Sequence, residues 1–461
     1  MKKFIFFYVL LISTCHVLYS QSSSNTPTAP LLSPSGYMDK VYDKDGNVYN
    51  LADLQINLEQ AQRAFGKYSQ NNTIFVSNTT TCQAGIFTVY FANGSGMENT
   101  ASAIHNLRRA TVCEVLSNVS GQLNWAAWNS TVTVKILVDN VANHISSPSS
   151  SGVLGIATAF YAFPNNPSST NPGIIKNQIQ KTIQSKQDAW FNVVSPFATQ
   201  GGSGFYHGFM AFNFNNPTFN WNSAFTALAA TNQYDLYSVI LHEITHALGF
   251  ASLINGNGVS KFGVANNYYS TYDTYLKDNN FNPLISSTGT CNSLYNYAFT
   301  GNTINLQPSC TPGYNPNVTN CNTSCLYSSN SLSNMPIYTP DCFEPPSSLS
   351  HFEDMCFPTN NPGNNDKYFT MSNANGMGVN KRFLKEEERK VLCDLGYSVT
   401  TTYTSSALAA NTVYVGSACN SPNIWGQNDG LINGAYTFTS TGTTLTISIS
   451  SLLLNDATTT A

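Results

Sequence analysis

The clearest chemical potential in this sequence lies in two histidines and a glutamate within residues 234–250, Tyr-Asp-Leu-Tyr-Ser-Val-Ile-Leu-His-Glu-Ile-Thr-His-Ala-Leu-Gly-Phe. His242 and His246 are four residues apart, so on a helix they project from one face, one turn apart. That separation lets two imidazoles bind one tetrahedral metal ion. Glu243 lies beside them, where it can bind the attacking water rather than the metal. The pattern predicts a hydrolytic zinc site, although two histidines on an amphipathic helix also occur by chance.

A catalytic zinc needs a third protein ligand. The usual nearby position, three residues past Gly249, holds Ser252. Only one histidine follows His246, so a downstream imidazole ligand must be His351. A gluzincin-type site would use a glutamate from residues 386–388 instead, but such a run is also typical of a solvated helix face. The upstream histidines fit structural or loop positions better: His105, His144 and His207.

Together these motifs resemble the leishmanolysin-type metzincins and their bacterial secreted relatives. The resemblance covers roughly residues 85–400 and rests on four stretches: His242-Glu243-x-x-His246-x-x-Gly249-Phe250, Ser350-His351-Phe-Glu-Asp, Tyr368-Phe-Thr-Met371 and the helix end Cys393-Asp-Leu-Gly-Tyr397. In that family an inserted segment delays the third histidine, and a methionine turn forms a base under the zinc. Carried over, the ligands are His242, His246 and His351, and Met371 is the turn methionine, with Met377 the lesser candidate.

The resemblance implies an α+β zincin/metzincin fold. An upper subdomain would place a twisted sheet over the active-site helix, and a lower one would be irregular and disulfide-stapled. One catalytic zinc ion is implied; calcium is left open. A peptide substrate would lie in the cleft between the subdomains, along an edge strand. No clear cysteine-switch motif is found upstream, so the mode of activation is open.

The periodicity of apolar residues predicts the elements that must position these side chains. Strands are expected at residues 86–91, 131–138 and 153–163, and an edge strand at 205–214, directly before the motif helix. Helices are expected at 100–123 and, more polar or partly loop, at 173–191. A charged helix at 381–395 should end at Gly396. This order predicts a mixed α/β layer.

Composition divides the chain into five parts. We expect a signal peptide at residues 1–20, with a lipoprotein signal at Cys15 as the alternative, and a leader or pro-segment at 21–80. Residues 81–254 would form the upper subdomain, and 255–400 a Cys-rich insertion with the lower subdomain. Residues 401–461 would begin a C-terminal all-β module, similar to cadherin-like or immunoglobulin-like repeats.

The charge and the cysteine content indicate where the protein acts and which classes of partner are not expected. Only 10% of the 461 residues are charged and the net charge is −4, without a basic block. Nucleic acid and anionic membranes are therefore not expected as partners. No apolar run after the signal is long enough to span a membrane. Of the 11 cysteines, all but Cys15 would remain in the mature chain, which predicts about five disulfides in a secreted, extracellular or cell-surface protein.

Three function classes follow. The favoured one is a secreted zinc endopeptidase acting on proteins or peptides, with Glu243 as general base. The alternative is an extracellular binding or adhesion protein that keeps the zincin fold without catalysis. A metalloenzyme acting on a glycan is a third reading, but the sequence has no carbohydrate-specific feature to support it.

Overall fold

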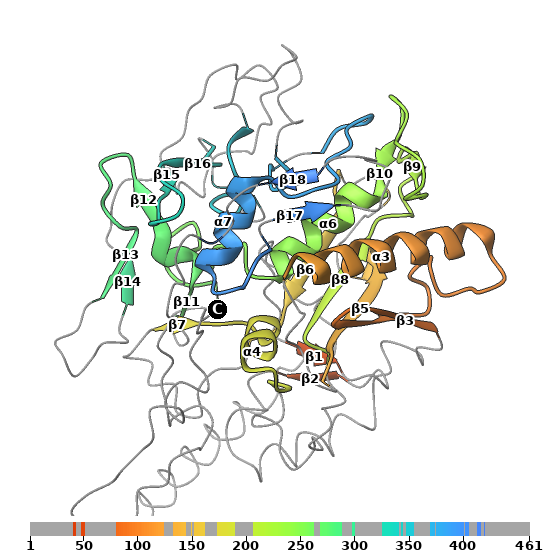
Figure 1. The fold of residues 1–461 in the computed structure, drawn as a ribbon, viewed down its shortest axis with the longest axis horizontal. Helices are drawn as coiled ribbons and strands as arrows, with labels where there is room; N and C mark the ends of the chain where they lie inside the picture. Colours follow the sequence, from red (N-terminus) through yellow and green to blue (C-terminus); the bar gives the residue numbers. More distant parts are fainter. Residues whose placement is uncertain are drawn as a thin grey trace, which may run out of the picture.

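The computed structural model centres on one five-stranded mixed sheet (Figure 1). It describes residues 80–123, 132–143, 152–161, 173–189, 206–261, 268–287, 325–340, 347–354, 369–373 and 375–400, with short segments at 40–42, 48–50, 297–299, 402–404 and 413–415 and single residues elsewhere. In spatial order the strands are β3 (Thr80–Ala84), β4 (Phe87–Phe91), β5 (Val134–Asn140), β8 (Gly208–Phe212) and β6 (Gly155–Ala159). The pairs β4–β5 and β5–β8 are parallel, and β3 and β6 close the sheet as antiparallel edges.

Burial follows the sequence pattern of each strand. In β4 the alternate residues Phe87, Val89 and Phe91 are buried, while Thr88 and Tyr90 are partly exposed. The central strands β5 and β8 are buried almost throughout, as expected for strands covered on both faces. The predicted strands at 86–91, 131–138 and 153–163 are confirmed; β4 and β6 are shorter than predicted, and β5 begins three residues later and ends two residues later.

The prediction that residues 205–214 form an edge strand is wrong. Strand β8 lies inside the sheet, between β5 and β6, and all its residues are buried. The edge nearest the motif helix is instead β6, which pairs antiparallel with β8. The physical reason is that strand order depends on long-range pairing. An uninterrupted apolar run such as Gly208-Phe-Met-Ala-Phe212 marks an interior strand, whatever follows it in the chain.

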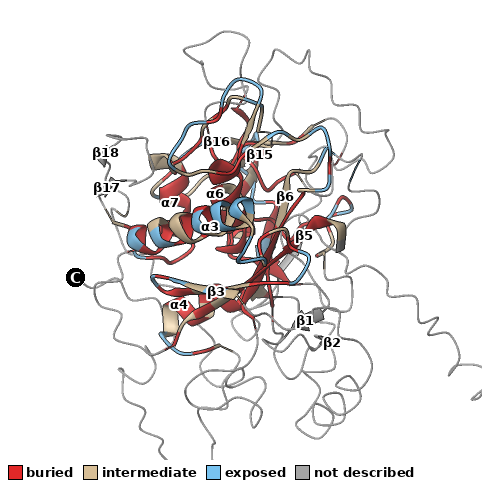
Figure 2. Ribbon diagram, turned by 90° about the vertical axis from the view of Figure 1, so that its right-hand side faces the viewer, coloured by how far each residue is buried: buried red, intermediate tan, exposed pale blue. Residues whose placement is uncertain are grey.

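Two long helices pack side by side against the sheet (Figures 1 and 2). Helix α3 (Ala103–Gln122) begins at Ser102, whose side chain accepts a hydrogen bond from the amide of His105. It buries one face and leaves the other open to solvent (Figure 2). Helix α6 (Leu236–Ala247) carries the motif and is buried on nearly every side. The predicted helix at 100–123 and the predicted motif helix are therefore confirmed.

Shorter elements complete the described part of the chain. The expected helix at 173–191 is divided into strand β7 (Ile174–Ile175) and helix α4 (Gln178–Ser185). The charged helix is α7 (Glu386–Asp394), which ends before Gly396, a residue with φ of +90°. The described residues between α6 and α7 form short elements: β11 (Tyr269–Ser270), η5 (Tyr272–Tyr275), β12 (Leu276–Asp278), β13 (Ile285–Ser287), β14 (Tyr297–Phe299), β15 (Cys325–Tyr327) and β16 (Met335–Ile337).

Within the described residues, two disulfides join parts of the chain that are distant in sequence. Cys82–Cys113 ties β3 to α3, and Cys393–Cys419 ties α7 to the chain beyond it. The expectation that every mature cysteine is oxidised is wrong at Cys325. This residue keeps a thiol, fully buried in β15, and burial raises its pKa far above the usual range.

Parts of the domain prediction fall outside the described residues. That is true of the expected signal at 1–20 and of the expected β module from residue 420 onward. Within the leader the structure describes one antiparallel pair, β1 (Lys40–Tyr42) with β2 (Val48–Asn50). Past residue 400 it describes β17 (Thr402–Thr404) with β18 (Val413–Val415), and the Cys393–Cys419 disulfide crosses the predicted boundary there. Among the described residues, none of the helices has the length and apolarity needed to traverse a bilayer.

Candidate metal centre

Helix α6 sets the spacing of the first two ligands. Its N-terminus is capped by Asp235, whose side chain accepts from the amide of Ser238 at 3.2 Å. The helix ends at Ala247, and Gly249 turns the chain with φ of +108°. This backbone conformation favours glycine, and a side chain here would also come within 3.0 Å of the end of the Gln180 side chain.

Three imidazoles converge on one point. The Nε2 atom of His246 lies 3.0 Å from Nε2 of His242 and 3.0 Å from Nε2 of His351. The third pair, His242 and His351, is separated by 3.3 Å. Ligands 2.0–2.1 Å from a tetrahedral metal ion would lie about 3.3 Å from one another. The three nitrogens therefore have the spacing of a metal-ligand set, and these residues form a group that could hold a metal ion.

The outer nitrogen of each ring fixes its tautomer. The Nδ1 atoms of His242, His246 and His351 lie 2.7, 2.7 and 2.8 Å from backbone carbonyl oxygens. Those carbonyls belong to Thr370, Phe250 and Ser347 respectively. A carbonyl oxygen only accepts hydrogen bonds, so each Nδ1 carries the hydrogen. Each Nε2 therefore turns its lone pair toward the common point, as metal coordination requires.

The surroundings keep the rings neutral. His246 and His351 are only 4% and 5% exposed, whereas His242 is partly exposed and borders the open side. Burial lowers the pKa of His242 to about 4 and that of His351 to about 3. Burial also holds the pKa of His246 well below its usual value. Neutral imidazoles are the form that binds a metal ion.

Glu243 lies against the edge strand. A side chain built at Gly155 of β6 would come within 3.1 Å of the Glu243 carboxylate oxygen and 3.1 Å of Val239. Glycine at this position thus leaves room for the carboxylate beside the metal centre. Burial raises the pKa of Glu243 to about 8, and a cation at the three imidazoles would favour its charged form.

Ser252 occupies the place of a nearby third ligand and helps to hold the distant one. Its hydroxyl donates to Asp273 at 2.6 Å, and its amide donates to the hydroxyl of Ser350 at 3.1 Å. Asp273 is fully buried and also accepts from the amides of Leu253 and Ser270. This network joins the chain after α6 to the residue before His351, so the end of the long insertion lies next to the motif helix.

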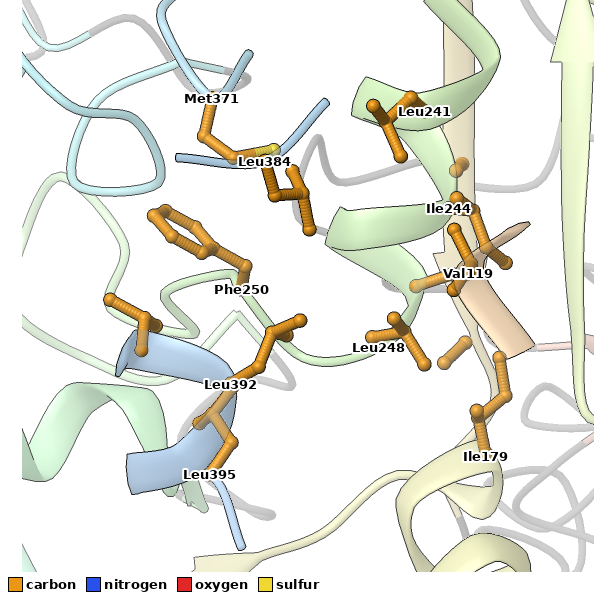
Figure 3. Packing of buried hydrophobic residues seen from close by; sticks show 14 of the residues in the cluster. Val119, Ile179, Leu241, Ile244, Leu248, Phe250, Met371, Leu384, Leu392 and Leu395 are labelled. Carbon is orange, nitrogen blue, oxygen red and sulfur yellow. The ribbon is translucent and has the colours of Figure 1, made fainter. Parts of the chain in front are cut away.

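Met371 belongs to a turn that hydrogen-bonds to His242 and to the residue after His351. It is fully buried, and Figure 3 shows it among apolar side chains between α6 and α7, near Leu384 and Phe250. Its carbonyl accepts from the amide of Phe352 at 2.8 Å, next to His351. The preceding carbonyl, of Thr370, is the one that binds His242. Met377, the lesser candidate, is 48% exposed and has no such position.

The remaining candidates have other roles. His105 accepts from the amide of Asn99, and His207 is buried against Asp188 at 3.2 Å. His144 lies outside the described residues. Within the described part of the chain, no glutamate from residues 386–388 joins the ligand group. Glu386 pairs with Lys390 on the helix surface, whereas Glu388 is buried and binds backbone amides.

Sequence reasoning missed Gly155 and Asp273, and it predicted neither the burial of Glu388 nor its bonds to backbone amides. Gly155 and Asp273 act through partners that are distant in the chain, and neither stands in a recognisable motif. Glu388 had one signal, its position three residues after Lys385, where a glutamate can cap a helix. No protein-family model, curated protein or solved structure matches this chain.

Proposed function

We propose that this protein is a secreted zinc-dependent endopeptidase with a zincin fold of the metzincin type. The observation that carries the proposal is the convergence of three neutral imidazole nitrogens beside a buried glutamate. The mixed sheet, the motif helix beneath it and the methionine turn agree with that fold. The two disulfides agree with an extracellular site of action.

The donor set favours zinc. Three imidazoles with no fourth protein ligand in the group are typical of a catalytic zinc site with an open position. A zinc ion held there supplies Lewis-acid chemistry, which acidifies water and polarises a carbonyl oxygen. The protein's own contribution is geometric, because the carbonyls of Thr370, Phe250 and Ser347 hold the three rings in place.

Glu243 would perform the proton transfers. Its carboxylate accepts a proton from the attacking water as the new C–O bond forms at the peptide carbonyl. The same proton then passes to the leaving amine nitrogen as the C–N bond breaks. Burial raises the pKa of Glu243 to about 8, and a cation held by the three imidazoles would lower it, which favours the ionised carboxylate that accepts the proton.

A peptide substrate would lie along β6 rather than along the strand first predicted. Leu154 and Phe160 direct backbone groups toward the β8 side, through bonds with Asn213 and His207. In an antiparallel ladder the backbone N–H and C=O groups of the alternate residues, such as Gly155 and Ala157, then point away from β8, toward the open edge of the sheet. An extended peptide can add to such an edge by backbone hydrogen bonds, and Gly155 would place it next to Glu243.

Replacing Gly155 with valine should therefore impair catalysis without removing metal. The new side chain would crowd the Glu243 carboxylate and Val239. We expect kcat/KM to fall on the order of 10- to 100-fold, since small misplacement of a catalytic group has effects of that size. Metal content, measured by mass spectrometry, should not change. Gly152→Val is the matched control, because nothing lies within 4 Å of a side chain built at Gly152. Equal activity of the two variants would argue against this placement of β6.

Metal removal tests the function as a whole. The purified chain should digest casein or gelatin, lose this activity in 1,10-phenanthroline and regain it when zinc is added. The reason is that the three imidazoles provide the only group of this kind in the described residues. Cleavage that persists without metal would exclude the proposed chemistry. Bound metal without any cleavage would favour an extracellular binding protein that keeps the fold.

A further inference from the structure

One peptide group connects the metal centre to a buried carboxylate on another helix. The carbonyl oxygen of Thr370 lies 2.7 Å from Nδ1 of His242. The amide nitrogen of the same peptide belongs to Met371, and it donates to Oε1 of Glu388 at 2.6 Å. The two bonds leave opposite ends of a single amide, so Glu388, this peptide and His242 form one continuous hydrogen-bonded chain.

Glu388 is held firmly for this role. Its side chain is fully buried, and its second oxygen, Oε2, accepts from the backbone amide of Lys385 at 2.6 Å. Lys385 is the residue at which α7 begins, and Glu388 lies in the first turn of that helix, where the helix dipole favours a negative charge. Burial raises the pKa of Glu388 to about 7, while the charge of Lys385 and the two backbone amides favour its ionised form. The carboxylate thus has two backbone donors, one at the helix start and one in the methionine turn.

The charge of Glu388 would affect the donor strength of His242 through this hydrogen-bonded chain. A carboxylate bound to an amide N–H polarises the amide and makes its carbonyl oxygen a stronger acceptor. A stronger acceptor at Nδ1–H makes the imidazole a better donor at Nε2. Metal-binding histidines often receive this support from a carboxylate directly. Here the peptide between Thr370 and Met371 would transmit it.

His246 lacks this arrangement. Its Nδ1 binds the carbonyl of Phe250, and the N–H of that peptide, from Ala251, donates to the neutral carbonyl of Gly249 at 2.8 Å. The Nδ1–H group of His242 can therefore be compared with that of His246, whose carbonyl partner has no carboxylate behind it. The difference between the two rings isolates the effect of the carboxylate.

We propose that Glu388 is a positioning residue that raises the metal affinity of His242 through the 370–371 peptide. The inference rests on the proposed metal site and adds to it a residue that is neither a ligand nor in contact with substrate. It gives the run at 386–388 a role that differs from both sequence readings, a solvated face and a glutamate ligand.

The test compares Glu388→Gln with Glu386→Gln. Glutamine keeps one oxygen that can accept from the Met371 amide, but it removes the charge and places an NH2 group where the second oxygen accepts from Lys385. The polarisation is lost while the side chain keeps its size, and circular dichroism checks that α7 is retained. Glu386→Gln makes the same chemical change on the helix surface, two residues away. Zinc affinity is measured by competition with a chromophoric chelator. We expect Glu388→Gln to bind zinc about tenfold more weakly, as loss of an outer-shell partner typically does, and Glu386→Gln to match the wild type.

A spectroscopic signature separates this role from a general loss of structure. In the zinc-loaded protein the Nδ1 proton of His242 should move upfield in the NMR spectrum of Glu388→Gln. The corresponding protons of His246 and His351 should stay in place. Equal zinc affinity in both variants, or equal movement of all three protons, would overturn the inference while leaving the metal site intact.

The wild-type protein provides a second measurement if Glu388→Gln does not fold. A through-hydrogen-bond scalar coupling between the Met371 amide nitrogen and the Glu388 carboxyl carbon should be detectable in labelled protein. Its absence would overturn the inference, since the chain would then be broken at its first bond. A wild-type protein that binds no zinc would instead overturn the proposed function and this inference with it.

Discussion

Glu243→Gln should abolish peptide hydrolysis while leaving the metal bound. The substitution keeps the size of the side chain in the narrow space beside Gly155, but an amide cannot accept the proton from the attacking water. Glu243 is not part of the ligand group, so the three imidazoles remain unchanged. We expect kcat to fall by roughly 100- to 10,000-fold, the usual contribution of a general base.

The measurement pairs a fluorogenic peptide assay with metal analysis of the same sample. Glu386→Gln serves as the control, because Glu386 lies on the surface of α7 and pairs with Lys390. Near-wild-type turnover by Glu243→Gln would remove the residue from the mechanism. An empty metal site in this variant would instead mean that Glu243 helps to hold the metal.

The helix and its two ligands could be predicted because the signal is local. His242 and His246 are related by one helical turn, and the residues between Asp235 and Gly249 contain both the cap and the stop of the helix. Such features depend on neighbours in the chain, which the sequence displays directly. The same holds for β4, in which the alternation of residue types predicts the alternating burial.

His351 could be found for a different reason. The chain has only 7 histidines, so counting those after His246 left a single choice. What counting could not show was how the insertion brings His351 back. That depends on the buried network of Ser252, Asp273 and Ser350, whose members come from distant segments and carry no motif.

The sheet edge and Glu388 could not be predicted, because both depend on pairing between distant segments. The apolar run at 208–212 indicates a buried strand, but nothing local in it identifies β6 as the strand that pairs with its outer side. Likewise the run at 386–388 reads as a uniform acidic surface, yet α7 turns Glu388 inward and leaves Glu386 outside. Carboxylates are rarely buried without a partner, and here two backbone amides act as the partners.

His351→Ala should strip the metal as completely as His246→Ala. Each removes one of three converging nitrogens, and two imidazoles alone bind a zinc ion weakly. The loss of zinc affinity should exceed the roughly 10- to 100-fold that removal of an outer-shell partner costs. The protein should still fold, because the backbone at this position stays anchored. The His351 carbonyl accepts from the amide of Tyr338 at 2.8 Å, and the hydroxyl of Ser350 accepts from the amide of Ser252.

The experiment reads zinc content after dialysis and near-ultraviolet circular dichroism on the same samples. His105→Ala is the matched control, since His105 lies on α3 and bonds the amide of Asn99, away from the ligand group. It should keep its zinc. A double variant, Glu386→Gln with Glu387→Gln, should also keep it, because neither glutamate belongs to the group. If the double variant lost zinc while His351→Ala retained it, the third ligand would be a glutamate and the metzincin proposal would give way to a gluzincin site. The geometry argues for the first result, since the Nε2 atom of His351 lies within 3.3 Å of the corresponding atoms of both helix histidines.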